Sequence, residues 1–109
     1  MYQHTPEQLS GFGSLRTQVF YYEDSVQGKS LAELIQEKLN TRLDVKRPRV
    51  AKGNKTYYLL KRSESVLNIV ECGFLTNPQE AELLQTDEYQ LKVADAISEG
   101  IDAYFSKNK

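Results

Sequence analysis

The feature that most constrains this chain is a strand-length run followed closely by a helix-period run. Residues Thr17–Tyr22 are rich in β-branched and aromatic side chains, which favour an extended strand. Ser25 or Ser30 is placed to cap a helix after it. Residues 26–43 then carry aliphatic side chains at offsets of three and four, on one helical face: Leu31, Leu34, Ile35, Leu39 and Leu43. This succession indicates an α/β architecture.

Two further strands are predicted in the middle of the chain. A basic connecting loop over residues 44–55 leads to strand candidates at Thr56–Lys61 and Val66–Val70. The second is a mostly continuous apolar run, as expected for a strand covered on both faces. Including the two helices that follow, the order is strand, helix, strand, strand, helix, helix. This order predicts an α/β domain with a layered sheet flanked by helices, although three strands make the sheet thin.

Capping signals set the limits of the last two helices. Asn77 suits an N-cap and Pro78 the first helical position, so a short helix is expected to run to Leu84. Thr86 or Asp87 is expected to cap the final helix. Apolar residues recur along that helix at about four-residue steps and predict its buried face: Tyr89, Val93, Ile97, Ile101 and Tyr104 or Phe105.

Length and composition exclude several classes of protein. The 109 residues fit one domain, and 14 Lys and Arg against 15 Asp and Glu give a formal net charge of −1. This balance does not indicate nucleic acid or an anionic membrane as a partner. The single Cys72 excludes an intrachain disulfide, and the single His4 excludes a site built from two histidines of this chain alone. Residues 1–16 are expected to be irregular and do not resemble a signal peptide, and no apolar run approaches the ~20 residues of a membrane span.

Glu71 is the residue whose position most suggests chemistry. It follows an apolar strand candidate and comes just before Gly73, and open α/β sheets bind ligands at such strand ends. A carboxylate there is suited to general acid–base catalysis. The alternative is a surface glutamate paired with a nearby Lys or Arg.

Three other features each allow a functional and an ordinary interpretation. Cys72 is either a nucleophile or, with no paired base nearby in sequence, a small buried hydrophobic residue. His4 is either a metal ligand or a solvated terminal histidine. The basic loop over residues 44–55 either contacts an anionic ligand or is a solvated connection.

A family resemblance adds to this interpretation. The stretch 69–84, with the sequence IVECGFLTNPQEAELL, resembles the signature near the end of zinc-dependent N-acetylmuramoyl-L-alanine amidases. Other parts of the chain also match that family: Thr17–Tyr22, Leu31–Ala32, Arg49–Lys52, Tyr57–Leu60 and the final helix at Tyr89, Gln90, Ala94, Ile97, Gly100, Ile101 and Tyr104. The resemblance is strongest to the single-domain amidases of spore-forming bacteria, which act on cortex peptidoglycan during germination.

The resemblance implies a hydrolase that cuts the amide between the lactyl group of N-acetylmuramic acid and L-alanine of the stem peptide. It implies peptidoglycan as the partner and the cell envelope or the exterior as the location. The family binds one zinc ion through two histidines and a glutamate, and the carboxylate that matches Glu71 is its catalytic acid/base. Zinc lowers the pKa of its bound water and polarises the scissile carbonyl.

The sequence also departs from the family pattern. The family's zinc ligands belong upstream of Thr17, where this chain has sixteen residues. His4 is followed by Thr5-Pro6 instead of a small residue and Asn, so it is not assigned to zinc. We expect residues 17–109 to be the C-terminal part of an amidase catalytic domain that lacks its N-terminal strands. Alone, the chain is expected to bind no zinc and to be inactive.

Two alternatives follow from the same departures. The chain could be a non-catalytic remnant of the amidase fold that binds peptidoglycan or a partner protein. It could also form a homodimer through the sheet edge left open by the missing strands, because unpaired strand edges are templates for pairing.

Overall fold

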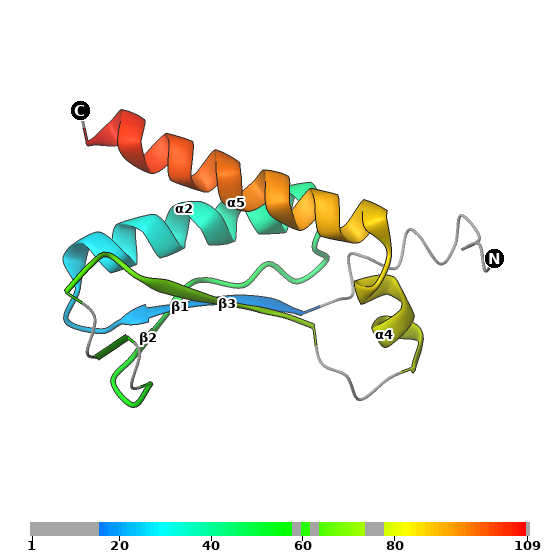
Figure 1. Cartoon of the computed structure of the whole chain (residues 1–109), viewed down its shortest axis with the longest axis horizontal. Helices are drawn as coiled ribbons and strands as arrows, with labels where there is room; N and C mark the ends of the chain where they lie inside the picture. The colour runs from blue at the N-terminus through cyan, green and yellow to red at the C-terminus, as the bar shows by residue number, and fades with distance from the viewer. Residues whose placement is uncertain (1–15, 58–59, 62–63, 74–77, 109) are drawn as a thin grey trace.

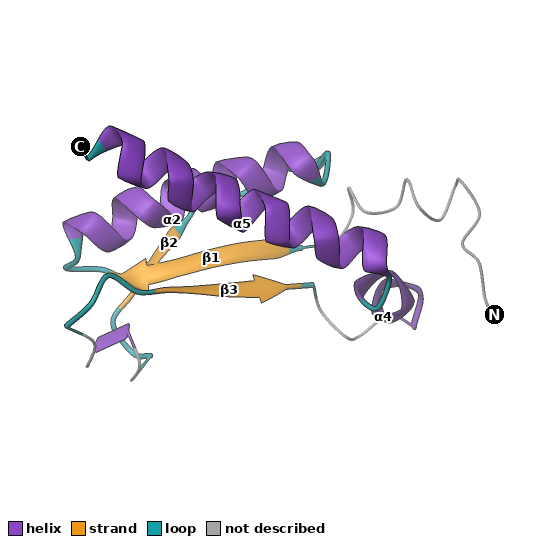
Figure 2. Cartoon of the chain, turned by 45° about the horizontal axis from the view of Figure 1, so that its top comes forward, coloured by secondary structure: helices purple, strands orange, loops and turns teal. Residues whose placement is uncertain are grey.

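The computed structural model describes residues 16–57, 60–61, 64–73 and 78–108 and arranges them in two layers (Figure 1). The elements in chain order are β1 (Thr17–Tyr22), α2 (Val26–Arg42), β2 (Lys52–Asn54), β3 (Asn68–Cys72), α4 (Pro78–Leu84) and α5 (Asp87–Lys107). The strands form one sheet in the order β2-β1-β3, and α2 and α5 lie together over one of its faces (Figure 2). The predicted class, an α/β layered sheet with helices, is confirmed.

The central strand β1 pairs with both neighbours. It runs antiparallel to β3 from the pair Thr17–Cys72 to the pair Tyr21–Asn68. On its other side it runs parallel to β2, but only through its last three residues, Phe20–Tyr22. The first half of β1 therefore depends on something other than β2 to satisfy its backbone on that side.

The side chain of Gln36 on α2 supplies this missing pairing. The backbone N–H of Val19 donates to Gln36 Oε1 at 2.8 Å, and Gln36 Nε2 donates to the carbonyl of Thr17 at 3.2 Å. The amide thus binds β1 as the backbone of a neighbouring strand would. Gln36 is only 2% exposed, so water cannot hydrogen-bond to these backbone groups of β1. The Gln36 amide satisfies them instead.

The helix limits agree closely with the capping signals. The N–H of Gly28 donates to Ser25 Oγ at 2.9 Å at the start of α2, and Thr86 caps α5 in the same way. The short helix α4 begins at Pro78 and ends at Leu84, as predicted. The predicted cap Asn77 lies outside the described residues.

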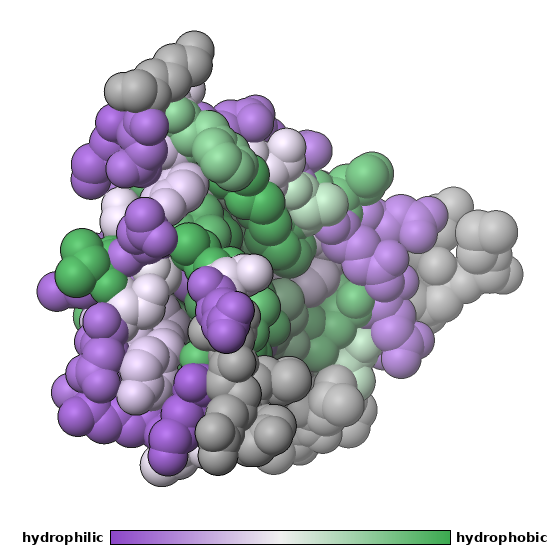
Figure 3. All heavy atoms as spheres, turned by 60° about the vertical axis from the view of Figure 1, so that its left-hand side comes forward, coloured by the Kyte–Doolittle hydropathy of each residue, from purple (hydrophilic) through white to green (hydrophobic). Residues whose placement is uncertain are grey.

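The core lies between the two helices and the sheet. Helix α5 crosses α2 at Gly100, where an added Cβ would lie 2.7 Å from Cγ1 and 2.8 Å from Cα of Ile35. Buried hydrophobic residues from both layers form one cluster: Val19, Ala32, Ile35, Leu39, Leu43, Leu83, Tyr89 and Ala96. Seen from the left-hand end of Figure 1, hydrophobic residues form a band through the middle of the molecule with hydrophilic residues on both sides (Figure 3).

The predicted buried faces of both long helices are partly wrong. Leu34 is half-exposed and Ile101 is 36% exposed, whereas Leu31 packs against the core. Of the alternatives Tyr104 and Phe105, Tyr104 is the buried one. Gly100 of α5 lies directly against Ile35 of α2, and the buried residues of α5 are Tyr89, Ala96, Gly100 and Tyr104. The helix crossing, which the periodicity does not specify, thus decides which side chains are buried.

The strand predicted at Thr56–Lys61 is also wrong. Asn54 Oδ1 accepts from the N–H groups of Thr56 and Tyr57, which turns the chain, and the N–H of Lys61 donates to the Tyr57 carbonyl in a helical turn. The strand in this region is instead β2, inside the predicted basic loop. The sequence of β2, Lys-Gly-Asn, has no hydrophobic alternation. The strand joins the sheet through its backbone, so the hydrophobic pattern could not reveal it.

Strand β3 starts two residues later than the predicted Val66–Val70, and of its two faces the long helices cover one (Figure 2). All five of its residues are half-exposed, and α2 and α5 both lie on the same side of the sheet (Figure 2). Within the part of the chain that the structure describes, no helix is long and apolar enough to cross a membrane.

Candidate active site

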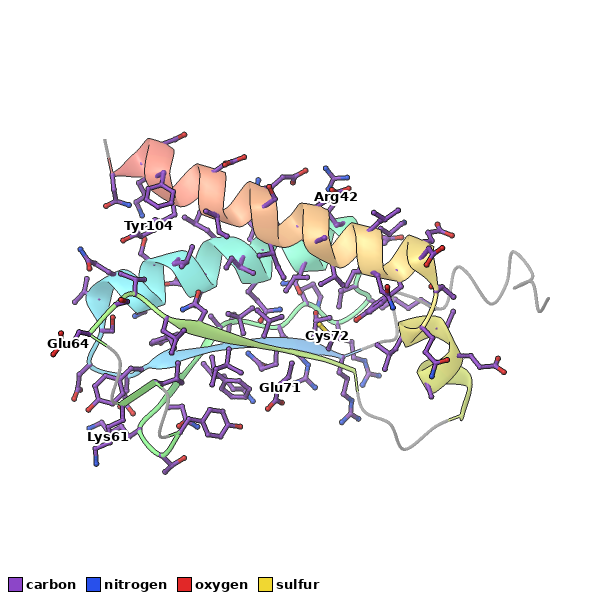
Figure 4. All side chains as sticks on the ribbon, viewed as in Figure 1. Arg42, Lys61, Glu64, Glu71, Cys72 and Tyr104 are labelled. Carbon is purple, nitrogen blue, oxygen red and sulfur yellow. The ribbon has the colours of Figure 1, made fainter. Side chains whose placement is uncertain are left out.

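Glu71 lies on the face of the sheet that α2 and α5 leave uncovered. Side chains alternate along β3, and Val70 and Cys72 pack against the core, so Ile69 and Glu71 point the other way. Asn68 points to the helix side, where its Nδ2 donates to the carbonyl of Gly28 at 3.0 Å. Figure 4 shows Glu71 on the side of the sheet away from the two long helices, with Cys72 on the helix side.

Two neighbours define the surroundings of the Glu71 carboxylate. Gln18 on β1 is paired with Glu71 across the antiparallel ladder, so their side chains emerge on the same face. The hydroxyl of Tyr57 donates to Glu71 Oε1 at 3.2 Å. The negative charge of Glu71 raises the pKa of the Tyr57 phenol above its ordinary value, and burial and the hydrogen bond act in the same direction. The phenol therefore remains a donor at neutral pH.

A polar cluster extends from Gln18 to the edge of the sheet. Gln18 is buried, and its Nε2 donates to the carbonyl of Val50 at 2.8 Å. Arg49 Nη1 donates to Gln18 Oε1 at 3.4 Å, and Asn40 Nδ2 donates to the carbonyl of Arg49 at 2.8 Å. These bonds fix the connection between α2 and β2 to β1, the strand paired with β3 at Glu71. The Arg49 guanidinium contacts Gln18, and Gln18 lies beside Glu71.

Cys72 is adjacent to Glu71 in sequence, but its side chain lies on the opposite face of β3. It is half-buried and packs against the hydrophobic core. Burial raises the pKa of its thiol, and a hydrogen bond with Tyr89 partly offsets that effect. These surroundings favour the small hydrophobic role over a nucleophile, because a reactive cysteine needs a lowered pKa.

The other candidates form no site in the described part of the chain. His4 lies outside the described residues. Among those that are described, no group of three or more His, Cys, Asp or Glu is placed to hold a metal ion. In the basic segment, Lys46, Arg47, Lys52 and Lys55 are exposed, as in a solvated surface.

The sequence alone did not reveal that Tyr57 and Gln18 lie beside Glu71, or that Arg49 binds Gln18. Tyr57 was expected inside a strand, where its direction could not be tied to Glu71. Gln18 could have been found from the alternation of β1 only once the register with β3 was known. The one available signal is a polar residue inside a strand-length run, at a position that alternates with the core residue Val19.

The fold defines a class of protein, because it is shared with amidases of known structure. The CwlD amidase from Clostridioides difficile, solved in complex with the GerS lipoprotein, matches with a TM-score of 0.78 and 40% identity, over 83% of this chain and 46% of that chain. A second structure, N-acetylmuramoyl-L-alanine amidase from Clostridium difficile 630, also has a TM-score of 0.78, with 26% identity, over 87% of this chain and 50% of that one.

The chain belongs to the N-acetylmuramoyl-L-alanine amidase family, which it matches over residues 11–103. The germination-specific N-acetylmuramoyl-L-alanine amidase of Bacillus subtilis (strain 168) is 38% identical over 90 residues, which is 83% of this chain and 38% of the relative. The amidase AmiA of Escherichia coli (strain K12) is 43% identical over 49 residues, 44% of this chain and 17% of the relative. The chain thus spans half or less of the length of these relatives.

Proposed function

We propose that residues 17–109 are the C-terminal part of an N-acetylmuramoyl-L-alanine amidase catalytic domain and that Glu71 is its acid/base. The observation that carries this proposal is the position of Glu71. It lies near the end of β3, on the sheet face that α2 and α5 leave uncovered, within the family match that spans residues 11–103. The proposed substrate is the muramoyl-peptide of peptidoglycan, and the proposed location is the cell envelope or the exterior.

Hydrolysis of this amide requires two proton transfers. The oxygen of water forms a bond to the carbonyl carbon, and the bond from that carbon to the nitrogen of L-alanine breaks. In our proposal Glu71 takes a proton from the attacking water and returns it to the leaving amine. The carboxylate is half-buried and accepts a hydrogen bond from Tyr57, so one of its oxygens is anchored while it exchanges protons.

The zinc ion that the family implies does not fit the described residues, which assemble no group that could hold a metal. When bound, zinc would lower the pKa of the attacking water and polarise the carbonyl. We propose that its ligands lie in the part of the relatives' length that this chain does not span. The step that we assign to this chain is therefore the proton transfer by Glu71.

A chimera tests the proposal. Residues 17–109 would replace the matching region of the germination-specific amidase of Bacillus subtilis, to which the chain is 38% identical. We expect a folded, zinc-loaded chimera to release stem peptides from purified muropeptides, whereas the chain alone releases none. A chimera that folds and holds one zinc ion but releases no stem peptide would overturn the proposal.

A pull-down separates this proposal from the alternative of a binding remnant. The chain alone would be mixed with purified peptidoglycan in the presence of a chelator. We expect it to stay in the soluble fraction, because the described residues assemble no metal-holding group to complete the proposed substrate site. Retention on the peptidoglycan pellet would favour the remnant, and a dimer in light scattering would favour pairing through a sheet edge.

A further inference from the structure

We propose that Tyr57 is the positioning residue of Glu71: its hydroxyl holds the carboxylate in place, and a turn built by Asn54 holds Tyr57. This inference rests on the proposed function of Glu71. It adds a second residue to the site and assigns a task to the segment that follows β2. Three contacts carry it, from the backbone of the turn to the ring and then to the hydroxyl.

The first contact fixes the backbone at Tyr57. Asn54 Oδ1 accepts from the N–H of Thr56 at 2.7 Å, from the N–H of Tyr57 at 2.8 Å and from Thr56 Oγ1 at 3.1 Å. One side-chain oxygen thus closes the turn. Asn54 is itself the last residue of β2 and pairs with Tyr22, and its carbonyl accepts from the N–H of Glu23 at 3.2 Å. The turn is therefore anchored to the central strand of the sheet.

The second contact fixes the ring. Tyr57 packs edge-to-face on Phe20, with ring centroids 5.4 Å apart and planes at 69°. Phe20 lies two residues after Gln18 on β1, so it emerges on the same face of the sheet as Glu71. Edge-to-face packing restricts the orientation of both rings. With its backbone and its ring both held, Tyr57 has little freedom in where its hydroxyl points.

The third contact is the hydrogen bond from the hydroxyl to Glu71 Oε1 at 3.2 Å. It engages one carboxylate oxygen, which leaves Oε2 as the oxygen that we assign to proton exchange with the substrate. Because the adjacent negative charge raises the pKa of the phenol above its ordinary value, Tyr57 keeps its proton at neutral pH. Tyr57 thus orients Glu71 without exchanging the proton itself.

The other polar groups near this carboxylate belong to the strand beside it and to its flanking segments. Gln18 faces Glu71 from β1 and bonds to the Arg49 guanidinium. Arg16 precedes β1, and its carbonyl accepts from the N–H of Gly73, so the ladder continues past the strand. Tyr57 reaches the same carboxylate from the segment after β2, through the hydrogen bond from its hydroxyl to Glu71 Oε1.

Nuclear magnetic resonance of the chain, with carbon-13 label in its tyrosine rings, tests the coupling directly. In the wild-type protein the phenol of Tyr57 should titrate above its ordinary range. Glu71→Gln should shift that titration to lower pH, because it removes the charge that opposes deprotonation. The control Glu64→Gln changes an exposed glutamate and should leave the Tyr57 titration in place. An unchanged Tyr57 titration in Glu71→Gln would overturn the proposal.

A second measurement separates positioning from simple packing. Tyr57→Phe keeps the ring on Phe20 but removes the hydroxyl, and side-chain relaxation of Glu71 reports how firmly the carboxylate is held. We expect Glu71 to become more mobile in Tyr57→Phe but not in the matched control Tyr22→Phe. Equal mobility in the two variants would refute the positioning role.

Neither measurement depends on catalysis. If both succeed but the chimera remains active without the Glu71 carboxylate, the proposed function of Glu71 fails while its coupling to Tyr57 stands.

Discussion

The exchange of Gln36 for leucine tests how the sheet is completed. Leucine has a similar volume and fits a helix, so the main change is the loss of the amide that binds β1. The Val19 N–H loses its acceptor at 2.8 Å, and the Thr17 carbonyl and Asn40 Oδ1 each lose a donor at 3.2 Å. The position is 2% exposed, so water cannot easily replace these partners.

The magnitude follows from these bonds. A buried N–H left without an acceptor costs about 1 to 3 kcal/mol, and each remaining hydrogen bond contributes about 1 kcal/mol. The added apolar burial of leucine returns about 1 kcal/mol or more. We therefore expect the free energy of unfolding to fall by roughly 2 to 4 kcal/mol, a large share of the ~5 to 15 kcal/mol typical of a domain.

Urea unfolding followed by circular dichroism measures this loss. Gln27→Leu is the matched control, because Gln27 is exposed in the first turn of the same helix, and it should change the free energy of unfolding by less than about 0.5 kcal/mol. If Gln36→Leu were as stable as Gln27→Leu, the amide would not be acting as a strand partner for β1.

Two further predictions concern the helix crossing and the thiol. Gly100→Ala should lower the free energy of unfolding by about 1 to 3 kcal/mol despite the better helix propensity of alanine, because the new methyl meets the backbone of Ile35. The exposed Ser98→Ala serves as its control, and equal stability of the two variants would contradict the close crossing. For Cys72, burial raises the folded pKa above the ordinary 9.0, so the unfolded chain loses its proton first and stability should fall as pH rises above that value. Urea unfolding at increasing pH should show a shallower fall for Cys72→Ala, and an identical fall would argue against the raised pKa.

The parts of the fold that were predicted correctly are those set by local signals. Ser25 and Thr86 cap their helices through their own side chains, and Thr17–Tyr22 contains enough β-branched and aromatic residues to be recognised as a strand. The register between β1 and β3 was not available in this way, because it depends on contacts between residues about fifty positions apart.

The errors arise where tertiary contacts override local patterns. Strand β2 pairs through its backbone, so Lys52–Asn54 has no hydrophobic alternation to reveal it. Helix α5 approaches α2 closely at Gly100, and a single glycine in the sequence does not indicate which helix face will be buried. In the sequence, nothing distinguishes Gln36 from other glutamines in a helix. Its pairing with β1 is visible only in the folded chain.

The candidate site was predictable only in part. Glu71 was singled out by its place at a strand end and by the amidase-like sequence around it. The contact with Tyr57 depends on the Asn54 turn, which replaces the strand expected there. A side chain that is brought to the site by a turn leaves no periodic signal in the sequence.

The rate of stem-peptide release by the chimera, compared between its wild-type and Glu71→Gln forms, tests the central claim most directly. General acid–base catalysis contributes about 10²- to 10⁴-fold, so the Glu71→Gln chimera should be slower by at least about 100-fold. The control Glu64→Gln should keep the wild-type rate, and zinc content should be the same in all three forms. A Glu71→Gln chimera that releases stem peptide as fast as the wild-type form would contradict the assignment of Glu71 as the acid/base.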